Sequence, residues 1–416
     1  MLKPIGMGAC IGSALLAGPV AYGQAESGNT VRMERLEKEN LALKQRLESI
    51  EVMMKKEGVG GPAPSHVVKA LSDMQISGFV TSSYFYDASD PGDQRSNGYL
   101  WNTTEDSFSI NKFKLTLAST PAERSGEKWD AAYRASLIFG EDAPIVNTGG
   151  ESQGLESLRE AYVELNAPVG TGLNIKAGQL ISLLNYESGD GGAANPNFSQ
   201  GYQWFYTGNG PSAGVQLGYT FTDWLDAKVR VQNGLYAGAI DNNSGKTFMG
   251  ALGIKPTKDL WFSLIGFGGD ENAAFSVMGG SLLAGYQVTQ PFGIGVEFDY
   301  FHFDPDPAPT ADFWSIGAWL TYDFTEKLGL ALRGEFLDDK DGFGIKGIAL
   351  GGRAGSAIMS PDLTGDLSSV TLTLNYKPLP NVKIQPEIRY DNTSYSGGFD
   401  GQDSRMIVGA GISYMF

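Results

Sequence analysis

Charged side chains recur at every second position in several segments of this 416-residue chain. In the segment 225–232, Lys228 and Arg230 alternate with Val229 and Val231. Successive side chains of an extended strand point to opposite faces, so this spacing gathers charge on one face and apolar groups on the other. A charged face of this kind holds water, ions and polar solutes, and an array of such strands would line an aqueous passage.

The same alternation, applied to the whole chain, predicts a set of inward charged side chains with nearly equal numbers of each sign. The basic members are Lys112, Lys114, Arg134, Lys176, Lys228, Arg230, Arg333, Lys383, Arg389 and Arg405. The acidic members are Asp130, Glu160, Glu164, Asp226, Glu297, Asp299, Glu335, Glu387 and Asp391. Because the signs nearly balance, we expect no strong ion preference, although walls of opposite sign would orient dipolar solutes. The alternative is that most of these charges neutralise one another.

Residue types needed for catalysis or metal binding are scarce. The sequence contains two histidines, His66 and His302, and one cysteine, Cys10. A hydrolase needs a nucleophile beside an oriented base, and a lone histidine gives no such arrangement. The acidic run 338–341 lacks the spacing and the closing Glu of a calcium loop. We therefore expect no enzyme activity, no cofactor and no dedicated metal site. A net charge of −16 also argues against nucleic acid as a partner.

A candidate constriction lies in the segment 184–209. It carries the acidic residues Glu187 and Asp190 and the aromatic residues Tyr202, Trp204 and Tyr206. Its aromatic side chains would either stack on sugars or anchor the segment to the wall.

The elements that must position these residues are strands with a period of two, which follow one another from residue 74 onward. The predicted strands are 74–87, 106–119, 129–140, 157–167, 171–183, 210–222, 224–234, 247–256, 259–269, 276–289, 292–304, 312–324, 327–338, 367–378, 381–393 and 404–416. Short connections alternate with long ones, the latter being 88–105, 141–156, 184–209, 235–246, 270–275, 305–311, 339–366 and 394–403. This order predicts an all-β fold: a transmembrane, antiparallel up-and-down β-barrel of about 16 strands over residues 74–416. A β-sandwich would not sort its connections in this way.

The final strand supports a membrane barrel. Apolar residues share one face from Met406 to Phe416, and no apolar run of 18 residues lies outside the N-terminus, which excludes a helical membrane protein. Outer-membrane barrels end on an aromatic residue in the same way. We expect the insertion machinery to recognise Tyr414 and Phe416.

The N-terminal part is of a different kind. Residues 1–23 have the basic start, apolar stretch and small-residue cleavage site of a signal peptide. Residues 24–57 contain a heptad seam, which predicts a short α-helical coiled coil, with a single amphipathic surface helix as the alternative. The seam residues are Met33, Leu36, Asn40, Leu43, Leu47, Ile50 and Met54. Residues 58–73 form a linker that begins with a run of Gly and Pro.

Several segments together resemble bacterial outer-membrane porins, and OmpL-like β-barrel porins in particular. They are LREAYVELNAPVGTGLNIKAGQ (158–179), NPNFSQGYQWFY, GPSAGVQLGYTFTDW and the ending PEIRYDNTSYSGGFDGQDSRMIVGAGISYMF. The resemblance covers roughly residues 74–416 and implies a barrel that acts as a pore. In general porins the loop after the fifth strand folds inward, and porins with a preceding coiled coil are often trimers.

We therefore expect a passive diffusion channel for small hydrophilic solutes in the outer membrane of a Gram-negative-type envelope, with the N-terminal segment in the periplasm. The expected partners are outer-membrane lipids, lipopolysaccharide, the insertion machinery and two further copies of the chain in a homotrimer, with peptidoglycan as a further candidate. Two alternatives stay open. One is a sugar-selective channel, and the other is a structural anchor whose coiled coil tethers the envelope.

Overall fold

The computed structural model describes residues 74–92, 94–96, 102–146, 156–208, 210–235, 241, 243–272, 275–345, 358 and 360–416, and a few residues between 38 and 49. The chain divides into two units, Met1–Ser72 and Asp73–Phe416. In the first unit the described residues are helical and exposed. The predicted signal peptide, the seam residues from Met33 to Met54 and the linker 58–73 lie outside the described residues.

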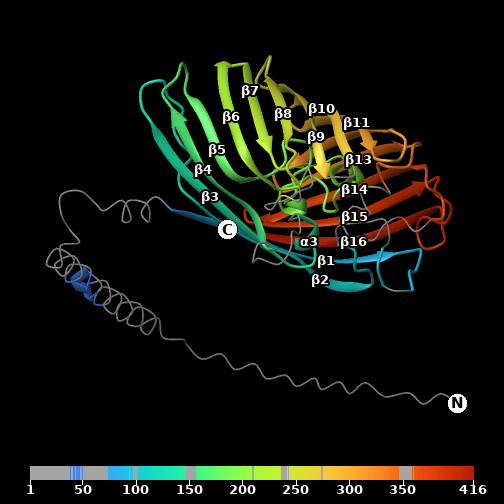
Figure 1. Cartoon of the computed structure of the whole chain (residues 1–416). Helices are drawn as coiled ribbons and strands as arrows, with labels where there is room; N and C mark the ends of the chain where they lie inside the picture. Colours follow the sequence, from blue (N-terminus) through green and yellow to red (C-terminus); the bar gives the residue numbers. More distant parts are fainter. Residues whose placement is uncertain are drawn as a thin grey trace, which may run out of the picture. The chain divides into compact units, whose positions relative to one another are not determined.

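The second unit is a barrel in which the described residues form sixteen antiparallel strands (Figure 1). The strands are β1 (Gln75–Asp87), β2 (Ser107–Ala118), β3 (Asp130–Phe139), β4 (Leu158–Ala167), β5 (Leu173–Leu180), β6 (Ser212–Thr222), β7 (Leu225–Gln232), β8 (Thr247–Ile254), β9 (Leu260–Asn272), β10 (Phe275–Thr289), β11 (Phe292–Pro305), β12 (Ala311–Thr325), β13 (Leu328–Asp339), β14 (Gly365–Leu379), β15 (Val382–Thr393) and β16 (Ser404–Met415). Each strand pairs with its neighbours in sequence, and β16 pairs with β1. The predicted antiparallel barrel of about 16 strands is confirmed.

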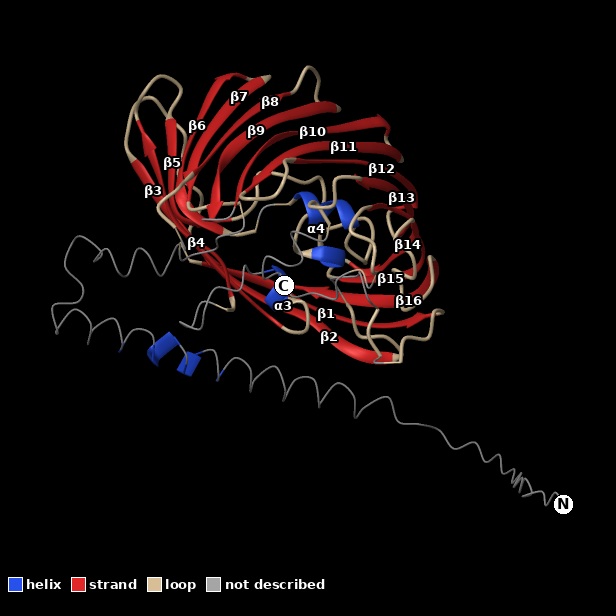
Figure 2. Ribbon diagram, turned by 45° about the vertical axis from the view of Figure 1, so that its right-hand side comes forward, coloured by secondary structure: helices blue, strands red, loops and turns tan. Residues whose placement is uncertain are grey.

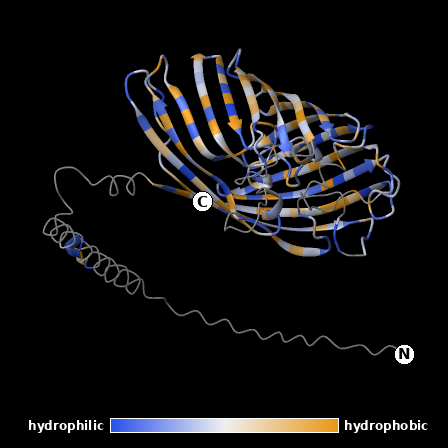
Figure 3. Ribbon diagram, in the orientation of Figure 1, coloured by the Kyte–Doolittle hydropathy of each residue, from blue (hydrophilic) through white to orange (hydrophobic). Residues whose placement is uncertain are grey.

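The alternation of side chains along each strand explains why these segments close into a barrel. In β15, Ile388 and Tyr390 are exposed on the outside, whereas Glu387 and Arg389 are buried on the inside. Figure 3 shows the same alternation of apolar and polar residues along the other strands. Lipid offers no hydrogen-bond partners to a backbone, so a sheet in lipid must pair every strand edge.

The pairing of β16 with β1 closes the barrel. The N–H of Gly78 donates to the carbonyl of Phe416 at 2.9 Å, and the N–H of Phe416 donates to the carbonyl of Gly78 at 3.0 Å. The ring of Phe416 also stacks on that of Phe113, with 6.5 Å between ring centroids. Met406 and Tyr414 are exposed on the outside, as the alternation predicts.

The connections differ between the two ends of the barrel, which we call the short-turn end and the long-loop end. The short-turn end holds connections such as 223–224, 290–291, 326–327 and 380–381, and its longest member is 119–129. One predicted long connection is wrong: 270–275 shrinks to 273–274 because β9 and β10 both extend beyond their predicted ends. Trp224, Phe324 and Tyr376 are exposed near the short-turn end, as expected of an aromatic belt at a membrane interface.

The helices of the barrel unit are short. Those described are α3 (Ala143–Val146), the 3₁₀ helix η1 (Gly191–Ala193) and α4 (Tyr202–Thr207). None of the helices in the described ranges has the length and apolarity that a membrane crossing would require.

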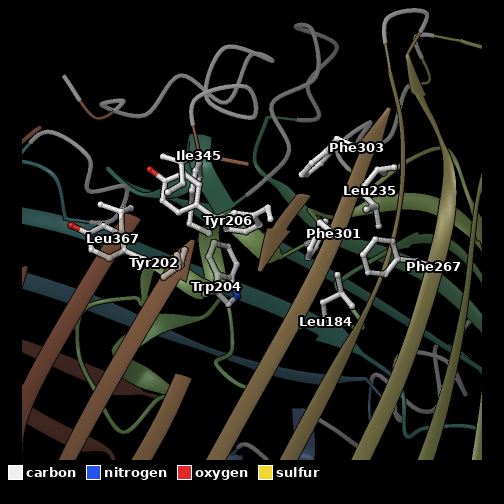
Figure 4. Packing of buried hydrophobic residues seen from close by; sticks show 14 of the residues in the cluster. Leu184, Tyr202, Trp204, Tyr206, Leu235, Phe267, Phe301, Phe303, Ile345 and Leu367 are labelled. Carbon is white, nitrogen blue, oxygen red and sulfur yellow. The ribbon is translucent and has the colours of Figure 1, made fainter. Parts of the chain in front are cut away.

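The buried apolar cluster lies inside the barrel. It joins inward side chains of the wall, such as Phe267, Phe301 and Phe303, to Leu184 and Trp204 of the connection between β5 and β6 (Figure 4). An apolar inner face in contact with water would be unfavourable, so this part of the wall requires a cover. The cover comes from connections that fold inward.

Candidate functional site

The connection between β5 and β6, residues 181–211, folds into the barrel and is called the inserted loop. It carries η1 and α4, and Figure 2 shows α4 on the side of β12 to β15. The N–H of Tyr186 donates to Glu297 Oε2 on β11 at 2.9 Å. The N–H of Phe198 donates to Glu387 Oε2 on β15 at 2.8 Å. The inserted loop is therefore bound to the wall along much of its length.

Inward carboxylates accept hydrogen bonds from the inserted loop. The N–H of Gln203 donates to Glu335 Oε1 at 3.0 Å, and its side-chain Nε2 donates to Asp299 Oδ2 at 2.7 Å. Ser315 on β12 donates to the same oxygen of Asp299 at 3.0 Å. A loop inside a barrel loses its water, so each polar group of its backbone needs a partner from the protein.

Inward cations bind the carbonyl groups of the same loop. Arg389 Nη1 donates to the carbonyl of Gln200 at 2.8 Å. Lys383 Nζ donates to the carbonyl of Gly192 at 3.0 Å. Both cations are buried, so they serve the loop rather than open water.

Glu187 is the most heavily bonded carboxylate of the inserted loop. It forms a buried ion pair with Arg333 on β13, with 2.7 Å between Nη1 and Oε1, and it accepts the indole N–H of Trp319 at 3.1 Å. Its second oxygen accepts the N–H of Gly201 at 2.8 Å. Arg333 also pairs with Glu335, with 3.0 Å between Nε and Oε2. A buried pair of this kind is costly to break from one side, by about 3–5 kcal/mol.

Tyr202 of α4 lies among charged side chains of β15 and β16. Its hydroxyl donates to Asp391 Oδ2 at 2.9 Å and accepts a hydrogen bond from Arg405 Nη2 at 3.1 Å. The guanidinium of Arg389 lies over its ring, 4.4 Å from the centroid. Burial raises the pKa of Tyr202 well above its ordinary value, so the hydroxyl stays protonated.

The aromatic residues of the candidate constriction are covered. All four are buried and belong to the apolar cluster inside the barrel: Tyr202, Trp204, Phe205 and Tyr206. A sugar can stack only on an accessible ring face, so these four residues anchor the inserted loop instead of forming a sugar-binding surface.

Asp190 connects the inserted loop to β2. Its carboxylate pairs with Lys114, with 2.7 Å between Nζ and Oδ2. Burial raises the pKa of Asp190, but the opposing charges of Lys114 and Arg159 outweigh that effect and hold it below its usual range. Lys112, also on β2, pairs with Asp142 at 2.7 Å.

The wall from β3 to β7 keeps charged inner side chains that water reaches. Arg134 pairs with Glu160, with 2.6 Å between Nε and Oε1, and Lys176 lies 3.8 Å from Glu164. Arg134, Lys176 and Lys228 are all partly exposed. Since these residues alternate with outward apolar ones, their exposure is toward the inside of the barrel. This wall therefore faces a water-filled space.

The predicted inward residues thus occupy three settings. Glu297, Asp299, Arg333, Glu335, Glu387, Arg389 and Asp391 lie beneath the inserted loop, together with its own Glu187, Tyr202, Trp204 and Tyr206. Arg134, Glu160, Glu164 and Lys228 lie on the β3–β7 wall, while Lys112, Lys114, Asp190 and Arg230 lie where other side chains cover them wholly or in part. The loop amides Asn185 and Gln200 were not predicted, although amides in a long connection could have suggested a loop that must hydrogen-bond inside the barrel.

An aromatic row inside the barrel was also not predicted. It consists of Tyr186 of the inserted loop and of Trp261 and Trp319 of the wall. The ring of Tyr186 stacks on Trp319, with 4.6 Å between centroids, and lies parallel to Trp261 at 6.0 Å. Gly285 and Gly295 make room for the row, because a Cβ there would collide with Trp261 and Tyr186. Tyr186 and Trp261 are only half-buried.

Comparison with known proteins agrees with this geometry. The family model described as "Putative beta-barrel porin-2, OmpL-like" matches residues 73–416. No curated protein matches the sequence. The barrel is similar to the trimer form of OmpT, an outer membrane protein of Vibrio cholerae, with 12% identity and a TM-score of 0.52 over 82% of this chain and 99% of that one.

Two further solved structures share the fold at low identity. The anion-selective porin from Comamonas acidovorans has 11% identity and a TM-score of 0.53, over 82% of this chain and 99% of that one. The outer membrane channel DcaP of Acinetobacter baumannii has 15% identity and a TM-score of 0.51, over 82% of this chain and 97% of that one.

Proposed function

The chain belongs to the OmpL-like β-barrel porin family, and from this premise we propose that it is a passive diffusion channel for small hydrophilic solutes in the outer membrane. One observation carries the proposal. The inserted loop is bonded mainly to β11–β16, while Arg134 and Lys228 on the opposite wall stay partly exposed inside the barrel. A lumen packed solid would leave no such exposure.

The route of a solute runs between the inserted loop and the β3–β7 wall. Asp190 and Lys114 form its boundary on the β2 side, where the loop crosses to the wall. Passage requires no catalysis and no resident cofactor, because a fixed aqueous gap with polar walls suffices for small solutes.

Single-channel recording of the purified full chain in planar lipid bilayers tests the proposal. We expect current steps of defined size, and heat-denatured protein serves as the control. A structural anchor with a closed lumen would give no steps under the same conditions, so their absence would favour that alternative.

The aromatic row favours a sugar-selective channel as the second candidate. Tyr186 and Trp261 keep partial exposure, and a partly exposed aromatic ring can stack on a pyranose face. If the channel selects sugars, a maltooligosaccharide series would block the current and Trp261→Ala would relieve the block. A non-selective channel predicts no block by any member of the series.

The envelope assignments follow from the outside of the barrel and from relatives. The outer face exposes apolar side chains such as Val229, Leu252 and Ile388, which suits contact with lipid and lipopolysaccharide. The OmpT relative exists in a trimer form, and the heptad seam of residues 24–57 suits a homotrimer with that segment in the periplasm. Residues 1–23 would direct export, and the insertion machinery would recognise the last strand.

A further inference from the structure

On the β3–β7 wall, each cation keeps more contact with water inside the barrel than the carboxylate that pairs with it, although the inward set as a whole is nearly neutral. Arg134 and Lys228 keep 38% of their side-chain surface exposed, and Lys176 keeps 24%. Of their acidic partners, Glu160 and Glu164 keep only 5% and 9%, and Asp226 keeps 28%. The long cationic side chains therefore project past the short acidic ones toward the passage.

These three cations form a continuous row with a fourth cation, Arg124, which lies in a turn. We call the four residues Arg124, Lys228, Lys176 and Arg134 the cation row. Arg124 lies in the connection 119–129, and its guanidinium donates to Thr220, an inward residue of β6, at 3.3 Å. The charge of Lys176 interacts repulsively with those of Arg124 and Arg134, and Lys228 with those of Arg124 and Lys176. The row thus runs from the short-turn end into the barrel.

The pairing of the cation row with carboxylates is incomplete. The Nζ atoms of Lys176 and Lys228 lie 3.8 Å from Glu164 and Asp226, beyond the length of a hydrogen bond. Lys176 instead donates to the hydroxyl of Tyr162 at 3.2 Å. Ammonium groups held in this way keep hydrogen-bond donors for a passing solute.

Arg230 adds positive charge behind the row. It is buried on the inner face of β7 and is the next inward residue after Lys228. Within the described residues its guanidinium donates to neutral oxygens, with Gln216 Oε1 at 2.8 Å and the carbonyl of Ile181 at 2.8 Å. The acidic residues of the opposite wall cannot offset this charge for a solute, because the inserted loop covers Glu297, Glu335 and Glu387.

We propose that the channel prefers anions, and that its solutes are small inorganic anions and carboxylates guided by the cation row. The inference rests on the proposed channel function and adds the class of solute. The net charge of −16 does not oppose it, since screening confines each charge to about 10 Å at 0.1 M salt, so only the wall beside the passage acts on an ion.

The test is the zero-current potential of the full chain in planar bilayers across a tenfold KCl gradient. We expect the sign that corresponds to chloride permeating faster than potassium. We also expect the preference to weaken from 0.1 M to 1 M salt, because the screening length falls to about 3 Å. Lys176→Gln with Lys228→Gln should lower the chloride-to-potassium permeability ratio by about threefold or more.

Lys258→Gln is the matched control, because Lys258 lies in the turn 255–259 and is 90% exposed outside the passage. It should leave the permeability ratio unchanged. Current steps with a potassium preference, or a double variant that behaves like the control, would overturn the anion preference and leave the channel intact. Absence of steps would remove the channel itself. The sign of the zero-current potential of the wild type tests the anion preference even if the double variant fails to fold.

Discussion

At the scale of single residues, Glu187 determines how firmly the inserted loop is held. It joins Arg333, Trp319 and the backbone of Gly201 within a buried site. Glu187→Gln keeps the shape but removes the charge opposite Arg333. We expect a loss of about 3 kcal/mol in the free energy of unfolding, measured by urea titration in detergent micelles. Glu123→Gln, at a carboxylate that is 65% exposed, is the control. Equal unfolding midpoints for the two variants would contradict the anchoring role.

Asp190 gives a prediction for pH. Its folded-state pKa lies below the unfolded value of about 3.9, so its pairing with Lys114 contributes stability that is complete above about pH 4. That contribution is lost as the pH falls through the folded-state pKa. We expect channel noise to stay constant from pH 8 to 5 and to rise below about pH 4, as the loop loosens.

Asp190→Asn should be noisier than the wild type at neutral pH and should lack the part of the acid response that belongs to this pair. If the wild type and Asp190→Asn show the same noise at every pH, the Lys114–Asp190 pair does not hold the loop.

The ion preference that we propose for the channel could not be predicted from the sequence. Alternation predicts an inner position for Arg134, Arg333 and Glu387, because the period of a strand is a local property. Whether such a residue meets water depends on the path of the inserted loop, which is set by contacts between residues more than a hundred positions apart, such as Arg333 with Glu187. Periodicity carries no information about those contacts.

At the scale of elements, all sixteen strands were predictable to within three residues at each end. The reason is that lipid outside and polar groups inside impose one pattern on every strand. The connection 270–275 was mispredicted because β9 continues through the polar residues Asp270, Glu271 and Asn272, which carry no apolar signal, and because β10 begins one residue earlier, at Phe275.

The two ends of the segment 189–200 lie near each other in the inserted loop. Glu187 and Gly201 are already hydrogen-bonded to each other, so removal of residues 189–200 would join Ser188 directly to Gly201. We expect single-channel conductance to rise by about twofold or more, because the segment bonded to Glu387 and Lys383 would be gone and water would take its place.

Removal of residues 307–309 is the control for that deletion, since these residues are exposed in the connection between β11 and β12. It should leave conductance unchanged. A deletion of 189–200 that inserts normally and conducts like the wild type would mean that the inserted loop does not limit the current.

At the scale of the whole molecule, assembly is expected to depend on the N-terminal segment. Leu36→Asp with Leu43→Asp would place charge in the predicted seam and should shift the protein from trimer to monomer, as measured by mass photometry in detergent. Lys38→Asp with Lys44→Asp is the matched control, because both lysines are exposed on the helix. A trimer that survives the first pair would show that the barrels associate without the seam.

The pairing of β16 with β1, which closes the barrel, has a consequence for the order of folding. The inserted loop lies within a ring of strands whose last pairing joins Gly78 to Phe416, and its partners on β11 to β15 follow it in the chain. A loop with this many hydrogen bonds to the wall cannot enter a barrel that is already closed. We therefore expect the later strands to form around the loop before β16 pairs with β1. We infer that one edge of β1 stays unpaired until β16 forms. The interior of the barrel would then be packed before the last strand pairing is made.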